Sequence, residues 1–337
     1  MEAEDLRALR PATSDTASLL RYVPGVSLYG AGGVSSLPAI RGLADDRLRI
    51  KVDGMDLVSA CGNHMNPPLS YIDPTSVESI EVFAGIAPVS SGGDSIGGTI
   101  LVKSTPPEFA RPGEGTLRKG EVGAFYRSNG GAFGGHLAAT LATETLSLNY
   151  HGAHAQSDNY KAGEDFKPAG LAAAGRGWLA GDEVGSTLYK STNQSLSLGL
   201  KRDIHLLEFK VGVQDIPYQG WPNQRMDMTR NDSTQLNLRY EGDYDWGTLE
   251  ARAYSEQTRH AMQFHDDKLF WYGSNSGAPF PDGEPCEPSP GMNGCAAGMP
   301  MDTDGDNRGA RVQGEIPVSE RDRRHRLQCR RSRQDRP

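Results

Sequence analysis

Apolar and polar residues alternate with a period of two over much of the chain after about residue 119. The alternation is clearest in four segments, at 195–200, 207–213, 235–240 and 249–254. Successive side chains of a β-strand point to opposite faces, so each segment predicts a strand with one apolar and one polar face. Such strands fit a soluble sandwich and a membrane barrel equally well.

The lengths of the connections favour the barrel. Tight turns are expected at 143–145, 202–203, 243–247 and 319–322, and they alternate with links at 128–131, about 156–188, about 215–231 and about 265–309. Short turns on one rim and longer loops on the other are typical of outer-membrane barrels. We therefore predict an antiparallel transmembrane β-barrel of about eight strands.

The first 110 residues lack this alternation and predict a separate α+β domain of short elements. Arg47–Val52 predicts a strand that ends at Asp53-Gly54, a hairpin turn signal. Asp73 is suited to cap a short helix that begins at Pro74. Further short elements are expected at 16–22, 79–83 and 99–102. An eight-stranded barrel has room inside only for side chains, so either this domain lies outside the barrel or the barrel is incomplete.

The two ends of the chain bear on completeness. Arg321 to Pro337 contains eight arginines and no strand pattern. A basic tail can bind nucleic acid or anionic lipid, but a barrel needs a last strand, because an open edge leaves backbone groups unsatisfied in lipid. We interpret 321–337 as an out-of-frame basic tail and expect no nucleic-acid partner. The start at Met1 has no signal-peptide pattern, so we expect the true N-terminus to lie upstream.

Composition narrows the choice further. The 337 residues, with a net charge of −8, contain no run of eighteen apolar residues that predicts a membrane-spanning helix. Cys286 and Cys295 share a loop rich in Pro and Gly and either form a small disulfide ring or remain free thiols. No phosphate loop, catalytic triad or carboxylate pair stands out, so we do not expect an enzyme.

Two groups of soft ligands are the strongest chemical signal. Cys61 and Met65 lie in one predicted loop, and His260 and Met262 are two apart on a predicted strand, where they share its polar face. Thiolate, thioether and imidazole donors suit Cu(I) far better than hard ions. The bland alternatives are a buried apolar cysteine and two ordinary inward-facing residues. His64 is a reserve ligand or, more simply, a structural imidazole.

An acidic run, Asp302–Asn307, has the opening of a calcium-binding loop but lacks the glycine and glutamate that complete one. We predict a solvated acidic loop there. Met299 and Met301 beside it are candidate secondary contacts for a soft ion.

The first domain resembles the plug of TonB-dependent outer-membrane receptors. The resemblance is carried in order by Leu-Leu-Arg-Tyr-Val-Pro-Gly-Val at 19–26, Ala-Ile-Arg-Gly-Leu at 39–43, Lys-Val-Asp-Gly-Met at 51–55 and Ile-Asp-Pro-Thr-Ser-Val-Glu-Ser-Ile-Glu-Val at 72–82. It implies a plug domain at 1–110, the N-terminal part of the receptor barrel at 111–320, a place in the lipid of the cell outer membrane, and energy from the TonB complex.

Within these receptors, the segment Cys61 to Pro74 is similar to the copper-receptor branch, whose site joins a Cys-x-x-x-Met plug loop to a His-x-Met barrel strand. The resemblance implies that Cys61, Met65, His260 and Met262 bind copper, with Cu(I) favoured, as a transported ion that arrives free or on a carrier. It also implies a 22-stranded barrel, so we expect this chain to be a fragment. The alternatives are a TonB-dependent receptor for a metal chelate or a cobalamin-like ligand, and a soluble copper-binding protein.

Overall fold

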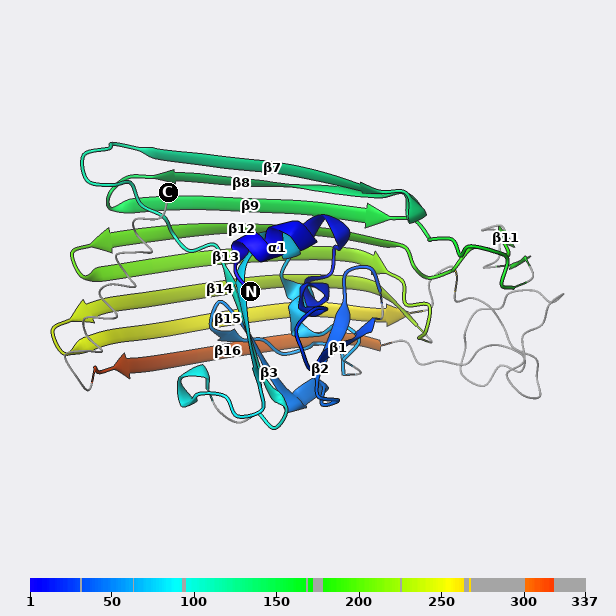
Figure 1. The fold of residues 1–337 in the computed structure, drawn as a ribbon, viewed down its shortest axis with the longest axis horizontal. Coiled ribbons are helices and arrows are strands. Elements are labelled where there is room, and N and C mark those ends of the chain that lie inside the picture. Colours follow the sequence, from blue (N-terminus) through cyan, green and yellow to red (C-terminus); the bar gives the residue numbers. More distant parts are fainter. Residues whose placement is uncertain are drawn as a thin grey trace.

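A small N-terminal domain lies against one face of a long antiparallel sheet in the computed structural model of the chain (Figure 1). The structure describes residues 1–30, 32–62, 64–92, 95–167, 169–171, 178–224, 226–263, 267 and 301–317. The basic tail, the turn expected at 319–322, Met299 and the cysteine pair Cys286–Cys295 lie outside the described residues.

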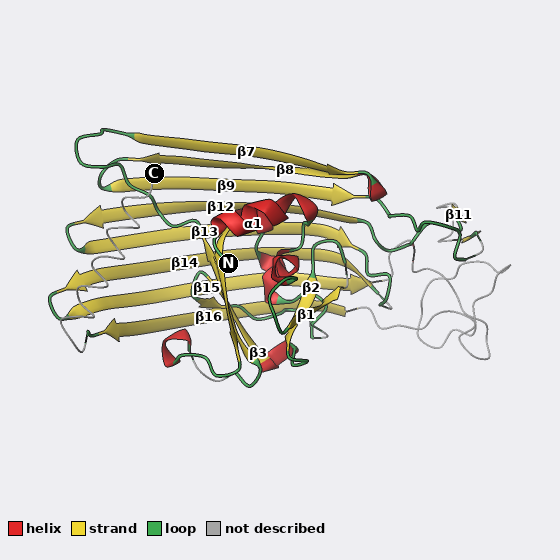
Figure 2. Cartoon of the chain, viewed as in Figure 1, coloured by secondary structure: helices red, strands yellow, loops and turns green. Residues whose placement is uncertain are grey.

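The N-terminal domain is built from short elements, as Figure 2 shows. Its two sheets are the pair β1 (Val26–Gly30) and β2 (Ser36–Ile40), and a four-stranded sheet in the order β4 (Met55–Asp56), β3 (Leu48–Val52), β6 (Gly98–Ser104) and β5 (Val77–Ala84). β3 runs parallel to β6, and the other pairs are antiparallel. The helices are α1 (Ala3–Leu9) and the 3₁₀ turns η1 (Arg10–Ala12), η2 (Thr16–Leu20), η3 (Asp45–Arg47), η4 (Pro68–Tyr71), η5 (Pro74–Ser76) and η6 (Val89–Ser91).

Local sequence signals explain two of these elements. Asp53 and Gly54 have φ angles of 50° and 76°, so both adopt the left-handed conformation that a two-residue hairpin turn requires. A Cβ atom on Gly54 would lie 2.7 Å from Nε of Arg252, so the glycine also allows the sheet to approach the turn. The Asp73 carboxylate accepts a hydrogen bond from the backbone N–H of Thr75 at 2.8 Å and caps η5. The predicted hairpin and cap are confirmed.

One apolar core holds this domain together. Burying an aliphatic side chain contributes about 1.5–3 kcal/mol. The residues that share the core come from α1, the 3₁₀ turns, β2 and the four-stranded sheet. They include Leu6, Leu19, Leu20, Ile40, Ile50, Val52, Met55, Leu69, Val77, Ile80, Ile100 and Val102.

The large sheet has eight strands in the order β16-β15-β14-β13-β12-β9-β8-β7, and all of its neighbours are antiparallel. Its strands are β7 (Leu117–Arg127), β8 (Ala132–Ala142), β9 (Leu146–Ser157), β12 (Tyr189–Arg202), β13 (His205–Gln219), β14 (Asp227–Tyr244), β15 (Gly247–Gln263) and β16 (Met301–Glu315). The 3₁₀ turn η7 (Asn129–Gly131) joins β7 to β8, and β10 (Gly170–Leu171) pairs with β11 (Trp178–Leu179) in the link between β9 and β12.

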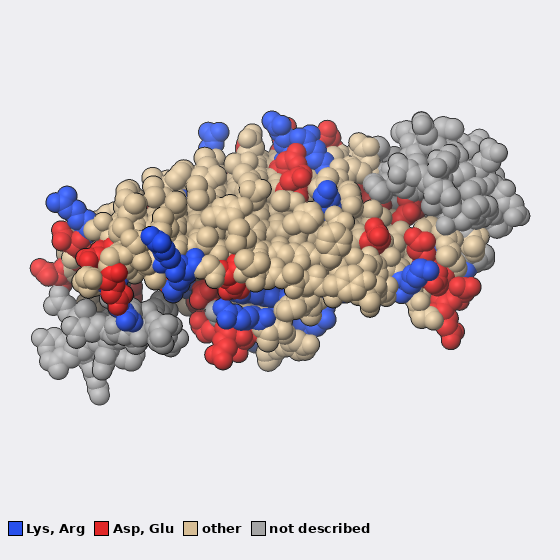
Figure 3. Space-filling view, turned by 90° about the horizontal axis from the view of Figure 1, so that it is seen from above, with Lys and Arg blue, Asp and Glu red and all other residues tan. Residues whose placement is uncertain are grey.

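The two faces of this sheet are the reverse of those in a soluble protein. Along β12, Leu196, Leu198 and Leu200 are 36–47% exposed on the outside, whereas Ser197 is buried towards the N-terminal domain. Much of the face seen in Figure 3 is likewise uncharged. An apolar outer face with a polar inner face is the pattern of a membrane barrel wall. The predicted fold, an α+β plug followed by an antiparallel barrel sheet, is confirmed.

Two predicted loops are wrong. Asp302–Asn307 is not a solvated loop but part of β16, where it pairs with β15. The link expected at about 215–231 is only 220–226, because β13 continues to Gln219 and β14 begins at Asp227. The reason is the same in both cases: inward-facing positions of a barrel wall are polar, so polar residues there do not mark a loop. No helix among the described residues is both long and apolar enough to cross a membrane.

Candidate metal centre

The loop that carries Cys61 and Met65 is closed by its own hydrogen bonds. The hydroxyl of Ser59 accepts from the backbone N–H of Cys61 at 3.2 Å and lies 2.9 Å from the carbonyl of Asn66, to which it donates. The N–H of His64 donates to the carbonyl of Cys61 at 2.9 Å. The Cys61 side chain is fully buried. These contacts hold the segment from Ser59 to Asn66, which we call the sulfur loop, in a compact shape.

The sulfur loop docks at both ends on the strands around His260. At one end, Thr303 Oγ1 donates to the carbonyl of Ala60 at 2.9 Å, and Thr303 is the direct partner of His260 in the β15–β16 register. At the other end, Asn66 Nδ2 donates to Asn231 Oδ1 at 2.8 Å. The same oxygen lies 3.2 Å from His260 Nδ1. The fold therefore places the sulfur loop next to residues 260–262. From the sequence, only the resemblance to the copper-receptor branch predicts this proximity.

Methionine side chains gather beside His260. Met262 is paired with Met228 on one side and with Met301 on the other, so three thioethers form a row across β14, β15 and β16. Met65 packs against the same cluster from the sulfur loop. The buried members of the cluster are Val34, Ala155, Tyr189, Ile216, Trp221, Met228 and Met262, and its partly buried neighbours are Met65, Phe125, Met226 and Met301.

The Nε2 atom of His260 is a candidate metal ligand beside the methionine cluster. The residue is fully buried, and its Nε2 has no hydrogen-bond partner among the described residues. A buried polar atom without a partner costs about 1–3 kcal/mol, so it calls for an explanation such as a ligand. His64, the reserve ligand, instead has its Nε2 3.6 Å from Asp46, whose side chain is 90% exposed.

Comparison with known proteins decides the family. Residues 1–99 match the family described as TonB-dependent Receptor Plug Domain. This N-terminal domain belongs to the plug family of TonB-dependent receptors, which are outer-membrane proteins. The N-terminal domain is therefore the plug and the sheet is part of the barrel wall, and the soluble alternative is set aside.

The proteins that this chain resembles differ in the ligands that they transport. The heme transporter BhuA of Brucella suis biovar 1 is 27% identical over 202 residues, which are 59% of this chain and 29% of that protein. The structure of the copper transporter OprC has a TM-score of 0.72 at 24% identity and covers 95% of this chain and 43% of that one. The structure of the FrpB iron transporter from Neisseria meningitidis has a TM-score of 0.64 at 18% identity. It covers 94% of this chain and 45% of that one. The chain thus spans less than half the length of these solved relatives, which share its fold and are transporters.

Sequence reasoning missed two kinds of residue at the site. Met226 and Met228 have the same spacing as His260 and Met262, which was a usable signal. Their place beside Met262 depends on a register shift between Met228 and Arg230, which the sequence does not reveal. Asn231, the inward residue that touches both the sulfur loop and His260, gave no signal at all.

The donors gathered here are of mixed type. Within the part of the chain that the structure describes, no three side chains of His, Cys, Asp or Glu are grouped so as to hold a metal ion. Cys61 is a free buried thiol in the loop, and the thioethers of Met65 and Met262 lie in the neighbouring cluster. Any ion bound here would rely on thioether sulfur, a ligand that selects soft ions.

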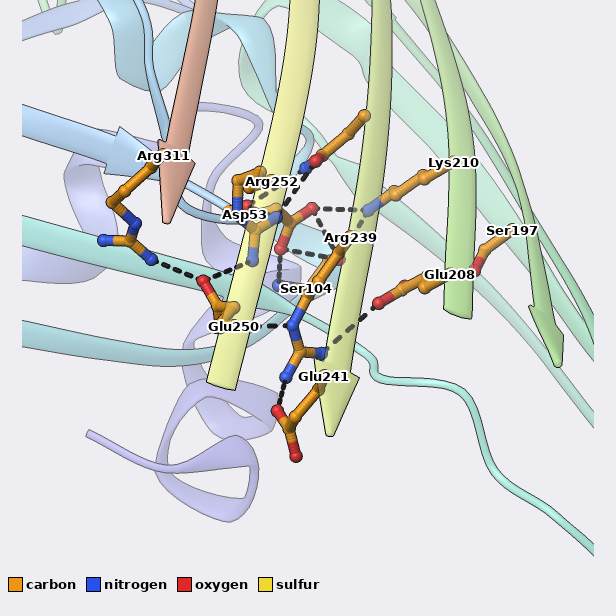
Figure 4. Close-up of polar contacts among 11 residues, drawn as sticks. Asp53, Ser104, Ser197, Glu208, Lys210, Arg239, Glu241, Glu250, Arg252 and Arg311 are labelled. Carbon is orange, nitrogen blue, oxygen red and sulfur yellow. Dashed lines mark hydrogen bonds and ion pairs between the residues drawn. The ribbon is translucent and has the colours of Figure 1, made fainter. Parts of the chain in front are cut away.

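A second contact fastens the plug to the wall at the hairpin turn (Figure 4). The Asp53 carboxylate lies 2.6 Å from Nζ of Lys210 and accepts two hydrogen bonds from Ser104. Its backbone carbonyl accepts from Asn237 at 3.0 Å and from Arg252. Burial alone raises the pKa of Asp53, but the charge of Lys210 and these hydrogen bonds outweigh burial and hold the pKa below its usual value.

Charged residues of the wall surround this turn. Arg239 pairs with Glu208, Glu241 and Glu250, and Arg311 pairs with Glu250 at 2.6 Å (Figure 4). Each of these charged side chains lies on the inner face of the sheet, which faces the plug. The network keeps the inner face polar while its members neutralise one another.

Proposed function

We propose that this receptor binds copper, as Cu(I), between the sulfur loop of the plug and strand β15 of the wall, for transport across the outer membrane with energy from the TonB complex. One observation carries the proposal. The loop with Cys61 and Met65 is hydrogen-bonded to β14 and β16, the strands on either side of β15, which carries His260 and Met262. The Nε2 atom of His260 is buried there without a hydrogen-bond partner among the described residues.

The donor types support copper over a hard ion. A thiolate, two thioethers and a neutral imidazole are soft or intermediate ligands, and no carboxylate belongs to the set. Met228 and Met301 flank Met262 and offer further thioethers. Deprotonation of Cys61 on binding would supply one negative charge to balance a monovalent ion.

The division of the ligands between plug and wall suggests how copper is released. Cys61 and Met65 belong to the plug, whereas His260 and Met262 belong to the wall. A pull on the plug that shifts the sulfur loop away from β15 separates the two pairs of donors. The affinity then falls because each half retains only two ligands.

The test is copper binding by the purified, detergent-solubilised protein. We expect close to one copper per chain by elemental analysis and little binding of Ca²⁺ or Mg²⁺. Cys61→Ala should lose most of the copper. Met262→Leu removes the thioether but keeps the volume, and about tenfold weaker Cu(I) binding is expected, equivalent to about 1.4 kcal/mol.

Met55→Leu is the matched control, since Met55 is equally buried but lies in the plug core. It should bind copper like the unchanged protein. Copper content that survives Cys61→Ala unchanged would refute the site.

A second candidate is uptake of a metal chelate such as heme, favoured by the similarity to the heme transporter BhuA. A planar macrocycle needs an accessible cleft, whereas His260 and Met262 are both fully buried and therefore suit a bare ion better. Titration with hemin separates the two: a saturable shift of its absorption band that His260→Gln abolishes would favour the chelate.

A further inference from the structure

We infer that Asn231 is a positioning residue that fixes the tautomer of His260, so that the Nε2 lone pair is presented to the metal, and that Asn66 links this arrangement to the seating of the plug. The role towards copper rests on the proposed function. The proton assignment does not, because it follows from the hydrogen bonds alone.

The assignment begins at a backbone carbonyl, which can only accept. Gln214 lies with Nε2 2.6 Å from the carbonyl of Ser70 and 2.7 Å from Oδ1 of Asn193, so this end of the Gln214 amide is the donor end. Its other end, Oε1, must then accept. Asn231 Nδ2 lies 3.2 Å from that oxygen and donates to it. The orientation of the Asn231 amide is thereby fixed, with Oδ1 on its opposite side.

Asn231 Oδ1 in turn decides where the proton of His260 resides. This oxygen accepts from Asn66 Nδ2 at 2.8 Å and faces His260 Nδ1 at 3.2 Å. A carbonyl oxygen cannot donate, so Nδ1 must carry the hydrogen. A neutral imidazole has a single N–H, and Nε2 therefore keeps its lone pair. This is the buried atom that has no partner among the described residues.

The opposite tautomer would fail in two ways. It would place the Nδ1 lone pair of His260 against the lone pairs of Asn231 Oδ1, and it would turn an N–H towards the place where a metal must bind. Partners of the second ring nitrogen commonly set the tautomer of metal-binding histidines in this way. Because Asn66 directly follows Met65 and donates to the same oxygen, docking of the sulfur loop adds a contact to the residue that holds the ring.

The first test needs no metal. Nitrogen NMR of the metal-free protein labelled with [¹⁵N]histidine, with His260 assigned by its loss in His260→Gln, should show a protonated Nδ1 and an unprotonated Nε2. In Asn231→Leu the two tautomers should both be populated. A His260 that is protonated at Nε2 in the unchanged protein would overturn the inference.

The second test is Cu(I) affinity by competition with a chelator. Asn231→Leu should weaken binding about 10–100-fold, the usual effect of losing such a partner. Asn231→Asp should bind more tightly than Asn231→Leu, because a carboxylate still accepts from Nδ1. X-ray absorption of the copper-loaded Asn231→Leu protein should show reduced imidazole scattering at the metal.

The matched control is Asn237→Leu. Asn237 is on the same strand and the same face and is also buried. It too is hydrogen-bonded to the plug, where it donates to the carbonyl of Asp53. It should retain copper affinity if Asn231 acts through His260. Equal losses in Asn231→Leu and Asn237→Leu would reduce Asn231 to a plug contact and overturn the inference.

The proposed copper site and the positioning role of Asn231 can be refuted separately. If neither the unchanged protein nor Cys61→Ala binds copper, the proposed function fails while the tautomer is still tested by NMR. If copper binds through Cys61 but is indifferent to Asn231, only the positioning role fails.

Discussion

Asp53 shows how a single residue gains a second role from the fold. In the sequence it belongs to a turn signal, and its left-handed conformation fulfils that signal. In the structure its carboxylate also reaches Lys210 on β13, so one residue both turns the plug hairpin and fastens the plug to the wall. The buried charge is stabilised by its partners, and this creates a dependence on pH.

We predict that docking of the plug weakens as the solution is acidified. The pKa of Asp53 is lowered in the folded state, so its contribution is complete above the unfolded value of about 4 and is lost as the pH falls from there through the lower folded value. Protease protection of the plug, measured between pH 6 and pH 2, should decline over this window. Asp53→Asn should remove that part of the decline, whereas Asp46→Asn, at an exposed position, should not.

The hairpin β3–β4 illustrates what an element requires beyond its turn sequence. Two residues with positive φ are enough to close the hairpin, and the sequence supplies them. The packing of Arg252 over Gly54 is an additional demand that arises only when the wall is present.

We predict that Gly54→Ala destabilises the protein more than Gly42→Ala. Both glycines have φ near 80°, which costs an L-residue about 1–2 kcal/mol. A Cβ at Gly42 meets nothing within 4 Å, whereas one at Gly54 meets the Arg252 guanidinium. The difference in the free energy of unfolding between the two variants reports the contact with the wall, and equal losses would argue against that contact.

At the scale of the whole molecule, the outward-facing leucines determine which environment, lipid or water, suits the outer face of the sheet. Leu198 lies on the outer face of β12, and its partners on the two adjacent strands, Leu148 and Phe209, are also exposed and apolar. Lipid contact explains a row of exposed apolar side chains that water would disfavour.

We predict that Leu198→Arg lowers the stability of the lipid-inserted protein by up to about 2–4 kcal/mol, the cost of an arginine at the bilayer midplane. Leu198→Phe remains apolar and should have little effect. Denaturant unfolding of the protein in vesicles measures both variants. An arginine tolerated as well as phenylalanine would mean that this face does not contact lipid.

The sequence by itself determined the alternation of the strands, the hairpin at Asp53-Gly54 and the cap at Asp73, because each depends on neighbours only a few residues apart. It also pointed to the soft donors at 61–65 and 260–262. Short-range pattern cannot go further, since a polar residue facing the inside of a wall looks the same as one in a loop.

Only the tertiary structure decided where β13, β14 and β16 begin and end, because their inward polar residues are satisfied by the plug or by neighbouring strands. It alone placed Met228 beside Met262, through a shift in register. It alone brought Asn66, Asn231 and His260 together, because the hydrogen bond between Asn66 and Asn231, which are 165 positions apart, forms only when plug and wall meet. The residues of the candidate metal centre therefore come from two distant segments of the sequence, and only the folded chain brings them together.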